Sequence, residues 1–207
     1  MVRNSIILIF SCLVIFSCSN QRQGQIAIQP FGAFDPALTD TIKNTLESIY
    51  KTKVLTYPSK PIPKSAFVNV KTPRYRADSL IRILKRNKPD SIDCIIGLTN
   101  KDISTTKRNE IGLVKQPESK YSDWGVFGLG YRPGASSVVS TFRIKNKISD
   151  RFIERLKKIC THEIGHNLGL KHCSNSENCV MRDAAETIKT VDFVDLTLCK
   201  MCRSKLN

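Results

Sequence analysis

An eleven-residue stretch near the C-terminus, HEIGHNLGLKH over residues 162–172, contains all three histidines of the 207-residue chain. His162 and His166 are four residues apart, so on a helix their imidazoles project from one face and can share a zinc ion. Gly169 follows, and because glycine tolerates positive φ it can end the helix and turn the chain back. His172 then returns to the metal as a third ligand. The sequence therefore predicts a long helix that carries a three-histidine zinc site.

Glu163 adds a base to this site. It lies beside the predicted ligands on the same turn, where its carboxylate can take a proton from water that the metal activates. Three protein ligands leave one zinc position open, which is typical of catalytic rather than structural sites. The alternative is a chance match or a helix with surface histidines. The glycine and the third histidine make the motif far more specific than HExxH alone.

Four cysteines follow the histidine motif. They form two pairs, Cys173 with Cys179 and Cys199 with Cys202, and the second pair has CxxC spacing. Two such pairs are what a closed tetrahedral Cys₄ zinc site requires. Two disulfides are the competing interpretation, because the chain carries signs of export. The sequence favours zinc and leaves both states open.

The run from His162 to Cys202 resembles the archaemetzincins, a family of zinc proteases in the metzincin clan. Their pattern is HExxHxxGxxHC, four residues, CxM, seventeen residues and CxxC. The chain matches each block and the seventeen-residue spacing, but five residues rather than four separate Cys173 from Cys179. A surface turn absorbs a one-residue insertion easily. Weaker likeness extends upstream to residues 29–32, 74–77, 97–102 and 126–128.

The resemblance implies further features. Met181 would form the methionine-containing turn that metzincins place beneath the metal, with packing as its physical role. The fold would be a sheet-bearing N-terminal part, a cleft, and a small C-terminal part that closes the zinc site from below. The expected fold class is therefore α/β (α+β): a metzincin-like single domain with a mixed, mostly parallel sheet, an active-site helix and a small zinc-bearing C-terminal subdomain.

The N-terminus reads as an export signal. Arg3 precedes an apolar run over residues 6–16, which is too short for a comfortable membrane span. The sequence Ile15-Phe16-Ser17-Cys18 resembles a bacterial lipobox, with cleavage before Cys18 and a lipid on its sulfur. We expect a signal peptide at residues 1–17, a metallopeptidase domain at 18–207, and a lipid anchor in a bacterial cell membrane, with the outer membrane favoured. The alternatives are ordinary secretion, a periplasmic location, or an uncleaved anchor.

The charge of the chain bears on its binding partners. The net charge of +15 comes from 33 Lys and Arg against 18 Asp and Glu, dispersed along the chain. A basic balance suggests nucleic acid, but no aromatic and basic binding motif accompanies it, so we expect no nucleic-acid partner. A solvated basic surface is the favoured interpretation of this charge.

The two remaining cysteines, Cys94 and Cys160, are expected to be buried, inert thiols. The sequence leaves open a disulfide between them.

Hydrophobic periodicity outlines the remaining elements. Alternating strand and helix patterns predict a partly parallel sheet. Two later strands are joined by the turn Arg132–Ala135, which predicts a hairpin. The predicted strands are 26–28, 53–57, 66–70, 92–98, 124–131 and 136–143, and the predicted helices are 36–50, 77–86 and one that starts near Ser149.

The favoured function is a zinc-dependent peptidase with two zinc ions per chain, one catalytic and one structural. A strand within residues 124–143 would pair with an extended peptide or protein substrate, and the protein is expected to be a monomer. A non-catalytic lipoprotein that binds zinc or peptide is the rival function. Glu163 argues against it, because metal binding alone needs no carboxylate there. The sequence leaves open the substrate sequence, endopeptidase versus aminopeptidase action, and the physiological role.

Overall fold

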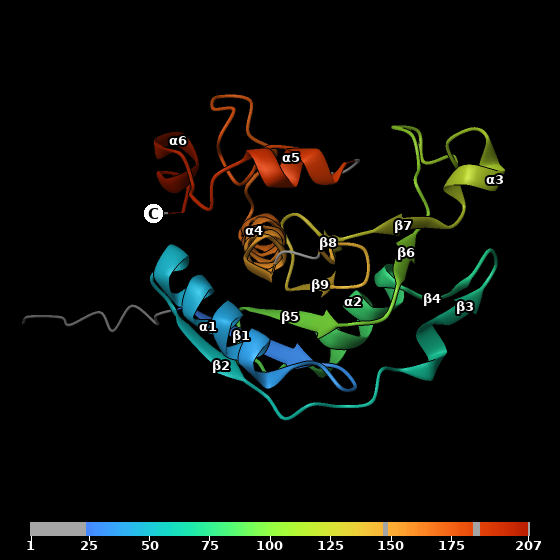
Figure 1. Ribbon diagram of the computed structural model, residues 1–207, viewed down its shortest axis with the longest axis horizontal. Coiled ribbons are helices and arrows are strands. Elements are labelled where there is room, and N and C mark those ends of the chain that lie inside the picture. The colour runs from blue at the N-terminus through green and yellow to red at the C-terminus, as the bar shows by residue number, and fades with distance from the viewer. Residues whose placement is uncertain (1–23, 147–148, 184–186, 207) are drawn as a thin grey trace, which may run out of the picture.

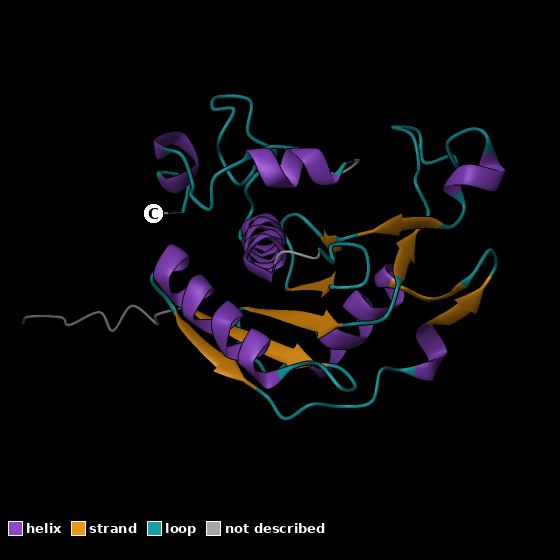
Figure 2. Ribbon diagram, in the orientation of Figure 1, coloured by secondary structure: helices purple, strands orange, loops and turns teal. Residues whose placement is uncertain are grey.

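The computed structural model describes residues 24–146, 149–183 and 187–206. The predicted signal peptide and Cys18 lie outside the described residues. Figures 1 and 2 show the elements in order. They are β1 Gln25–Pro30, α1 Pro36–Tyr50, β2 Lys53–Thr56, the 3₁₀ turn Lys64–Ala66, β3 Phe67–Asn69, β4 Pro73–Arg76, α2 Ala77–Asn87, β5 Cys94–Thr99, β6 Ile103–Thr105, α3 Glu118–Tyr121, β7 Trp124–Val126, β8 Gly128–Gly130, β9 Ser136–Ser140, α4 Ser149–Asn167, α5 Ile188–Phe193 and α6 Lys200–Arg203.

The main sheet has five strands in the order β2-β1-β5-β9-β8. The first four run parallel, and β8 pairs antiparallel with β9 at the edge. This arrangement confirms the predicted mixed, mostly parallel sheet. β1 and β5 are buried along nearly their whole length, as expected of parallel strands covered on both faces.

Helices cover both faces of this sheet (Figure 1). α1 and α4 share one apolar core with alternate residues of the central strands, including Ile28, Ile96 and Val139. α2 packs on the other face, where its buried residues are Ala77, Leu80, Ile81 and Leu84. These four residues form the apolar stripe that the helical periodicity predicts. The short helices α5 and α6 lie in a separate C-terminal part beside α4.

A second sheet, in the order β3-β4-β6-β7, was not predicted. The predicted strand 124–131 is in fact two strands: β7 belongs to this second sheet, and β8 to the main sheet. The polar stretch after β5, in which the sequence predicts no strand or helix, contributes β6 and α3. Asp102 links the two sheets, since its carboxylate accepts hydrogen bonds from Arg74 at 2.8 Å and from Arg143 at 2.6 Å.

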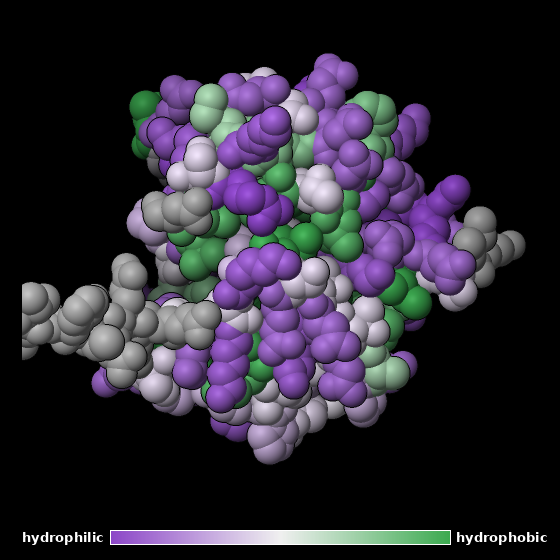
Figure 3. All heavy atoms as spheres, turned by 90° about the vertical axis from the view of Figure 1, so that its left-hand side faces the viewer, coloured by the Kyte–Doolittle hydropathy of each residue, from purple (hydrophilic) through white to green (hydrophobic). Residues whose placement is uncertain are grey.

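The described surface carries polar and apolar side chains, the latter including Val70, Ile111 and Phe193. Over the face shown in Figure 3, hydrophilic side chains dominate and apolar areas are small. Among the residues that the structure describes, no helix combines the length and apolar character required to cross a bilayer.

Candidate active site

Helix α4 ends where the sequence predicts. Gly169 has a φ of +93°, and its N–H bonds the carbonyl of His166 at 2.9 Å. The next amide, from Leu170, reaches back to the carbonyl of Gly165 at 2.9 Å. These two bonds form a Schellman motif, in which a glycine in the left-handed region ends the helix. The chain reverses here and brings His172 back beside the helix.

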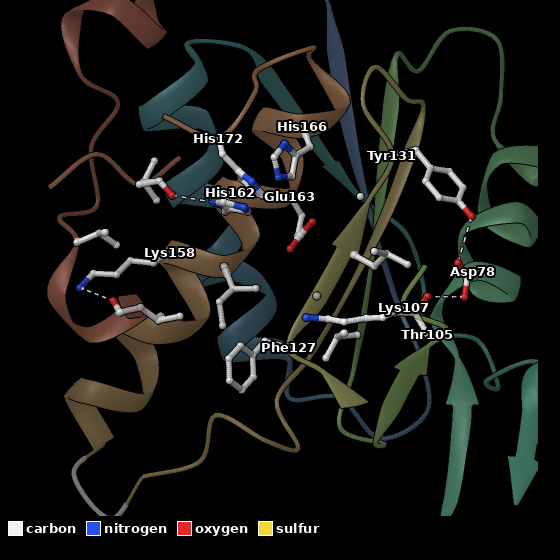
Figure 4. A pocket seen from close by; sticks show the side chains of 18 of the residues that line it. Asp78, Thr105, Lys107, Phe127, Tyr131, Lys158, His162, Glu163, His166 and His172 are labelled. Atoms are coloured by element: carbon white, nitrogen blue, oxygen red, sulfur yellow. Dashed lines mark hydrogen bonds between the residues drawn. The ribbon is translucent and has the colours of Figure 1, made fainter. Parts of the chain in front are cut away.

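The three histidines meet at one point. Their ring centroids are 4.5 Å apart for His162 and His166, 4.9 Å for His166 and His172, and 5.4 Å for His162 and His172. One potential ligand atom from each residue lies within 4.8 Å of the other two. The rings point toward one another in Figure 4. Small side-chain rotations suffice for one ion with Zn–N bonds of about 2.0–2.1 Å, so the donor set fits zinc.

Backbone carbonyls fix two of the rings. Nδ1 of His162 lies 2.8 Å from the carbonyl of Val180, and Nδ1 of His166 lies 2.8 Å from the carbonyl of Leu170. A carbonyl oxygen only accepts, so Nδ1 carries the hydrogen and Nε2 presents its lone pair to a metal. The third ring, that of His172, has its Nδ1 3.7 Å from a carboxylate oxygen of Asp183.

Burial lowers the proton affinity of the inner ligand. It lowers the pKa of His162 to about 3, and the neighbouring His166 acts in the same direction. The pKa of His166 is also lowered, chiefly by burial. Metal binding requires neutral imidazole, so this environment favours the ligating form of both side chains.

Glu163 lies beneath the histidines and points into the cleft (Figure 4). Its side chain is buried, and burial raises its pKa to about 8, although a backbone hydrogen bond from Gly130 opposes the shift. A carboxylate without its hydration shell is a stronger base than one in water. A dication at the histidines would favour the ionised form again.

Two glycines of β8 make room for this carboxylate. A Cβ at Gly128 would lie 2.9 Å from Cγ of Glu163, and a Cβ at Gly130 would lie 2.8 Å from the Glu163 carbonyl oxygen. The edge strand therefore packs on α4 more closely than any side chain would allow. Glu163 is consequently held between the helix and the strand.

A cleft of about 430 Å³ opens in front of the site. Its walls are mainly apolar and come from β7, β8, α4 and the C-terminal part (Figure 4). The lining includes Val126, Phe127, Leu129, Ile159, Val180, Val191 and Val194, with Asp78, Lys107, Tyr131 and Lys158 as polar members.

The α5 wall of this cleft was not predicted from the sequence. Arg155 on α4 makes a bidentate pair with Asp192 at 2.6 Å and 2.6 Å, and Lys158 donates to the carbonyl of Val191 at 3.2 Å. These contacts hold α5 against the active-site helix. The opposite wall was indicated by the sequence, through the likeness at residues 126–128 and the strand expected within residues 124–143.

The four C-terminal cysteines also converge. Their sulfur atoms all lie within 4.8 Å of one another, with Cys173 and Cys199 3.6 Å apart. Zn–S bonds of about 2.3 Å place tetrahedral sulfurs about 3.8 Å apart, so this donor set also fits zinc. Burial opposes ionisation of Cys199, but the backbone N–H of Cys202 and the adjacent thiols lower its pKa to about 7. Cys94 and Cys160 are buried free thiols, as predicted.

Met181 lies directly beneath the helix. It is fully buried, and its sulfur would be 2.4 Å from a Cβ at Gly165. Its carbonyl accepts a hydrogen bond from the N–H of Cys173 at 2.8 Å. A methionine below a helix with this histidine motif is the arrangement of the metzincin class of zinc metallopeptidases.

Comparisons with known proteins agree with this class. The model of peptidase family M54 matches residues 37–207. Archaemetzincin from Natronomonas pharaonis is 30% identical over 190 residues, with 87% of this chain and 98% of the relative covered. Archaemetzincin from Archaeoglobus fulgidus is 31% identical over 182 residues, covering 88% of this chain and 98% of the relative.

Solved structures lead to the same family. The crystal structure of the Archaeoglobus fulgidus archaemetzincin superposes with a TM-score of 0.69, covering 87% of this chain and 99% of that one. The archaemetzincin from Methanopyrus kandleri gives a TM-score of 0.72 at 26% identity, covering 91% and 96%. The chain belongs to peptidase family M54, the archaemetzincin family of zinc metallopeptidases.

The close packing of β8 on α4 can be tested with Gly130→Ala. The added methyl group would push the Glu163 backbone away from the strand, and a displacement near 1 Å can cost about 100-fold in rate. We expect peptidase activity to fall at least about tenfold while zinc content is kept. The measurements are steady-state peptide cleavage and metal analysis.

Gly112→Ala is the matched control. Gly112 has a φ of +82° with no atom within 4 Å of its Cβ position. Alanine there costs backbone strain of about 1–2 kcal/mol, and Gly112 is not among the residues that line the cleft, so activity should persist. Equal activity of the two variants would contradict the role given to the β8 contact.

Proposed function

We propose that this M54 metallopeptidase holds its catalytic zinc with His162, His166 and His172 and uses Glu163 as the general base of peptide-bond hydrolysis. The observation that carries the proposal is the convergence of three imidazoles beside a buried carboxylate that faces the cleft. The hydrogen bonds from Nδ1 of His162 and His166 to carbonyls support it, because they leave Nε2 free to ligate.

The proposed chemistry divides between metal and protein. Bound zinc supplies a Lewis acid that polarises the peptide carbonyl and lowers the pKa of a water molecule. The Glu163 carboxylate would take a proton from the water that attacks the carbonyl carbon, and would later give that proton to the amine as the C–N bond breaks. The desolvated setting of Glu163 suits a group that must hold a proton between these two steps.

We propose that the substrate peptide lies extended along β8. This strand is the edge of the main sheet, and its residues line the cleft beside Glu163. An edge strand offers unpaired backbone groups that can bond an extended peptide. The glycines at both ends of β8 leave its backbone open to that approach, and the apolar walls would accept apolar side chains beside the scissile bond.

The general-base role predicts the behaviour of Glu163→Gln. The amide keeps the shape of the side chain but cannot accept the proton, so activity should fall by about 10²- to 10⁴-fold with zinc retained. Single-turnover cleavage of a mixed peptide library tests the loss of activity, and metal analysis tests the retention of zinc.

Glu154→Gln on the same helix is the control, since its carboxylate pairs with Lys157 on the surface. It should cleave like the wild type. Unchanged cleavage by Glu163→Gln would refute the mechanism, whereas a wild type that binds peptides without cutting them would favour the binding-protein alternative.

We further propose that Cys173, Cys179, Cys199 and Cys202 hold a second, structural zinc. Two separate disulfides would not require all four sulfur atoms to share one point, as they do. Burial raises the pKa of the Cys179 thiol, and the N–H of Cys199, 3.4 Å from its sulfur, opposes that shift by favouring the thiolate.

This second site predicts about two zinc ions per chain. The four thiols should resist alkylation until a chelator is added, and Cys199→Ser should lower the zinc content toward one. The lowered count is expected because a closed site loses much of its affinity with one ligand. Intact mass and metal analysis of the same sample distinguish a zinc-bound set of four thiols from two disulfides. One zinc together with two disulfides would refute the proposal.

Membrane anchoring through Cys18 stays a proposal that rests on the sequence alone. In a bacterial host, the mature chain should begin at Cys18, carry acyl mass and partition into detergent. Cys18→Ala should abolish acylation, whereas Cys12→Ala should leave it intact, because Cys12 lies within the apolar run. Recovery of the wild type as a soluble, unacylated species would contradict the anchor.

A further inference from the structure

Tyr50 joins helix α1 to the active-site helix. Its hydroxyl donates a hydrogen bond to the carbonyl of Thr161 at 2.5 Å, across 111 residues of sequence. Thr161 directly precedes His162 in α4. The contact therefore reaches the turn of α4 that carries the first histidine and Glu163, from a residue that the histidine motif does not include.

The same hydroxyl faces the flank of α4 occupied by Met181. A Cβ at Gly165 would lie 2.4 Å from the Met181 sulfur and 3.1 Å from the Tyr50 hydroxyl oxygen. Gly165 falls between Glu163 and His166 in the motif. A phenol, a thioether and a glycine from three different segments thus meet on one side of the zinc-binding turn.

Tyr50 also touches the cysteine subdomain. It packs against the main core beneath α4 and against the C-terminal core that contains Cys179, Met181 and Cys202. The guanidinium of Arg203 reaches the carbonyl of Ile49, beside Tyr50, at 3.4 Å. Burial raises the pKa of Tyr50 well above its usual value, so the hydroxyl keeps its proton and stays a donor.

We propose that Tyr50 is a positioning residue for the catalytic centre, which fixes the His162 turn of α4 against Met181 through its hydroxyl. The inference rests on the proposed histidine site. An outer residue that orients metal-binding side chains affects metal affinity by roughly 10- to 100-fold when it is changed. A residue that only stabilises the fold has no such effect on the metal.

Tyr50→Phe removes the hydroxyl and keeps the ring. We expect the dissociation constant of the histidine-site zinc to rise about tenfold, measured by competition with a chelator. The visible absorption of the protein with Co²⁺ at this site should change, because the ligand geometry changes. In peptide cleavage, kcat should fall while KM stays near the wild-type value.

Ile42→Val is the matched control. Ile42 is buried on α1, eight residues before Tyr50 and so about 12 Å away along the helix. It should lower thermal stability without altering zinc affinity or the Co²⁺ spectrum. The proposal is overturned if Tyr50→Phe behaves in the same way, with lower stability and an unchanged metal site.

Two further results separate the possible failures. A wild type without peptidase activity would refute the proposed function, while zinc affinity and the Co²⁺ spectrum would still test Tyr50. If Tyr50→Phe does not fold, Gly165→Ala perturbs the same flank of α4 from the helix side, because its methyl group would lie 2.4 Å from the Met181 sulfur and 3.1 Å from the Tyr50 hydroxyl oxygen. A shifted Co²⁺ spectrum in that variant supports the proposal, and an unchanged spectrum overturns it.

Discussion

The last two turns of α4 remove two imidazoles and a carboxylate from bulk water, and that desolvation has a free-energy cost that the surrounding protein must offset. Each neighbouring segment supplies part of the compensation. The carbonyls of Val180 and Leu170 accept from the two histidines, and the Gly130 amide bonds Glu163. The position of β8 above the helix and of the methionine turn below it follows from these contacts, because neither segment could move without leaving a buried polar group unpaired.

The same requirement explains why α4 is packed so closely. A side chain larger than hydrogen at Gly128 or Gly130 would separate β8 from Glu163, and one at position 165 would displace Met181. The helix is consequently held on two sides by contacts of van der Waals distance. A metal site benefits from this rigidity, since ligands whose positions are fixed before the metal arrives lose little conformational entropy on binding.

Sequence patterns predicted the parts of the fold whose cause is local. The boundaries of α1 and the buried stripe of α2 follow from helical periodicity, and the end of α4 follows from Gly169. The second sheet was missed because β4 and β6 are only three or four residues long and carry polar side chains, and because β7 was joined with β8 in one predicted strand. Strands as short as β4 and β6 show no alternation that a single sequence can reveal. The hydrogen bonds of Asp102 with Arg74 and Arg143, which join the second sheet to the main one, are likewise invisible in the local pattern.

The residues of the candidate site also fall into two groups: some are marked by local sequence spacing, and others are brought in by contacts between distant segments. Its histidines, glutamate and cysteines lie at sequence spacings that by themselves indicate their chemistry. The α5 wall and the Tyr50 contact depend on segments that are distant in sequence, and nothing local marks them. Arg155 and Asp192 are 37 residues apart, and Tyr50 and Thr161 are 111 apart. Long-range pairs of this kind are a property of the packed chain.

In the C-terminal part, the order of the three-histidine cluster depends on the cluster of four cysteines. Its buried core is small and consists largely of Leu170, Leu198, Met181 and the cysteines themselves. A core of this size supplies little stability unless a metal or covalent links support it. Because Cys173 follows His172 directly and bonds the Met181 carbonyl, whatever orders the cysteines also orders the third histidine and the turn beneath the helix. The geometry of the histidine site is therefore tied to the state of four thiols that are not among the residues lining the cleft.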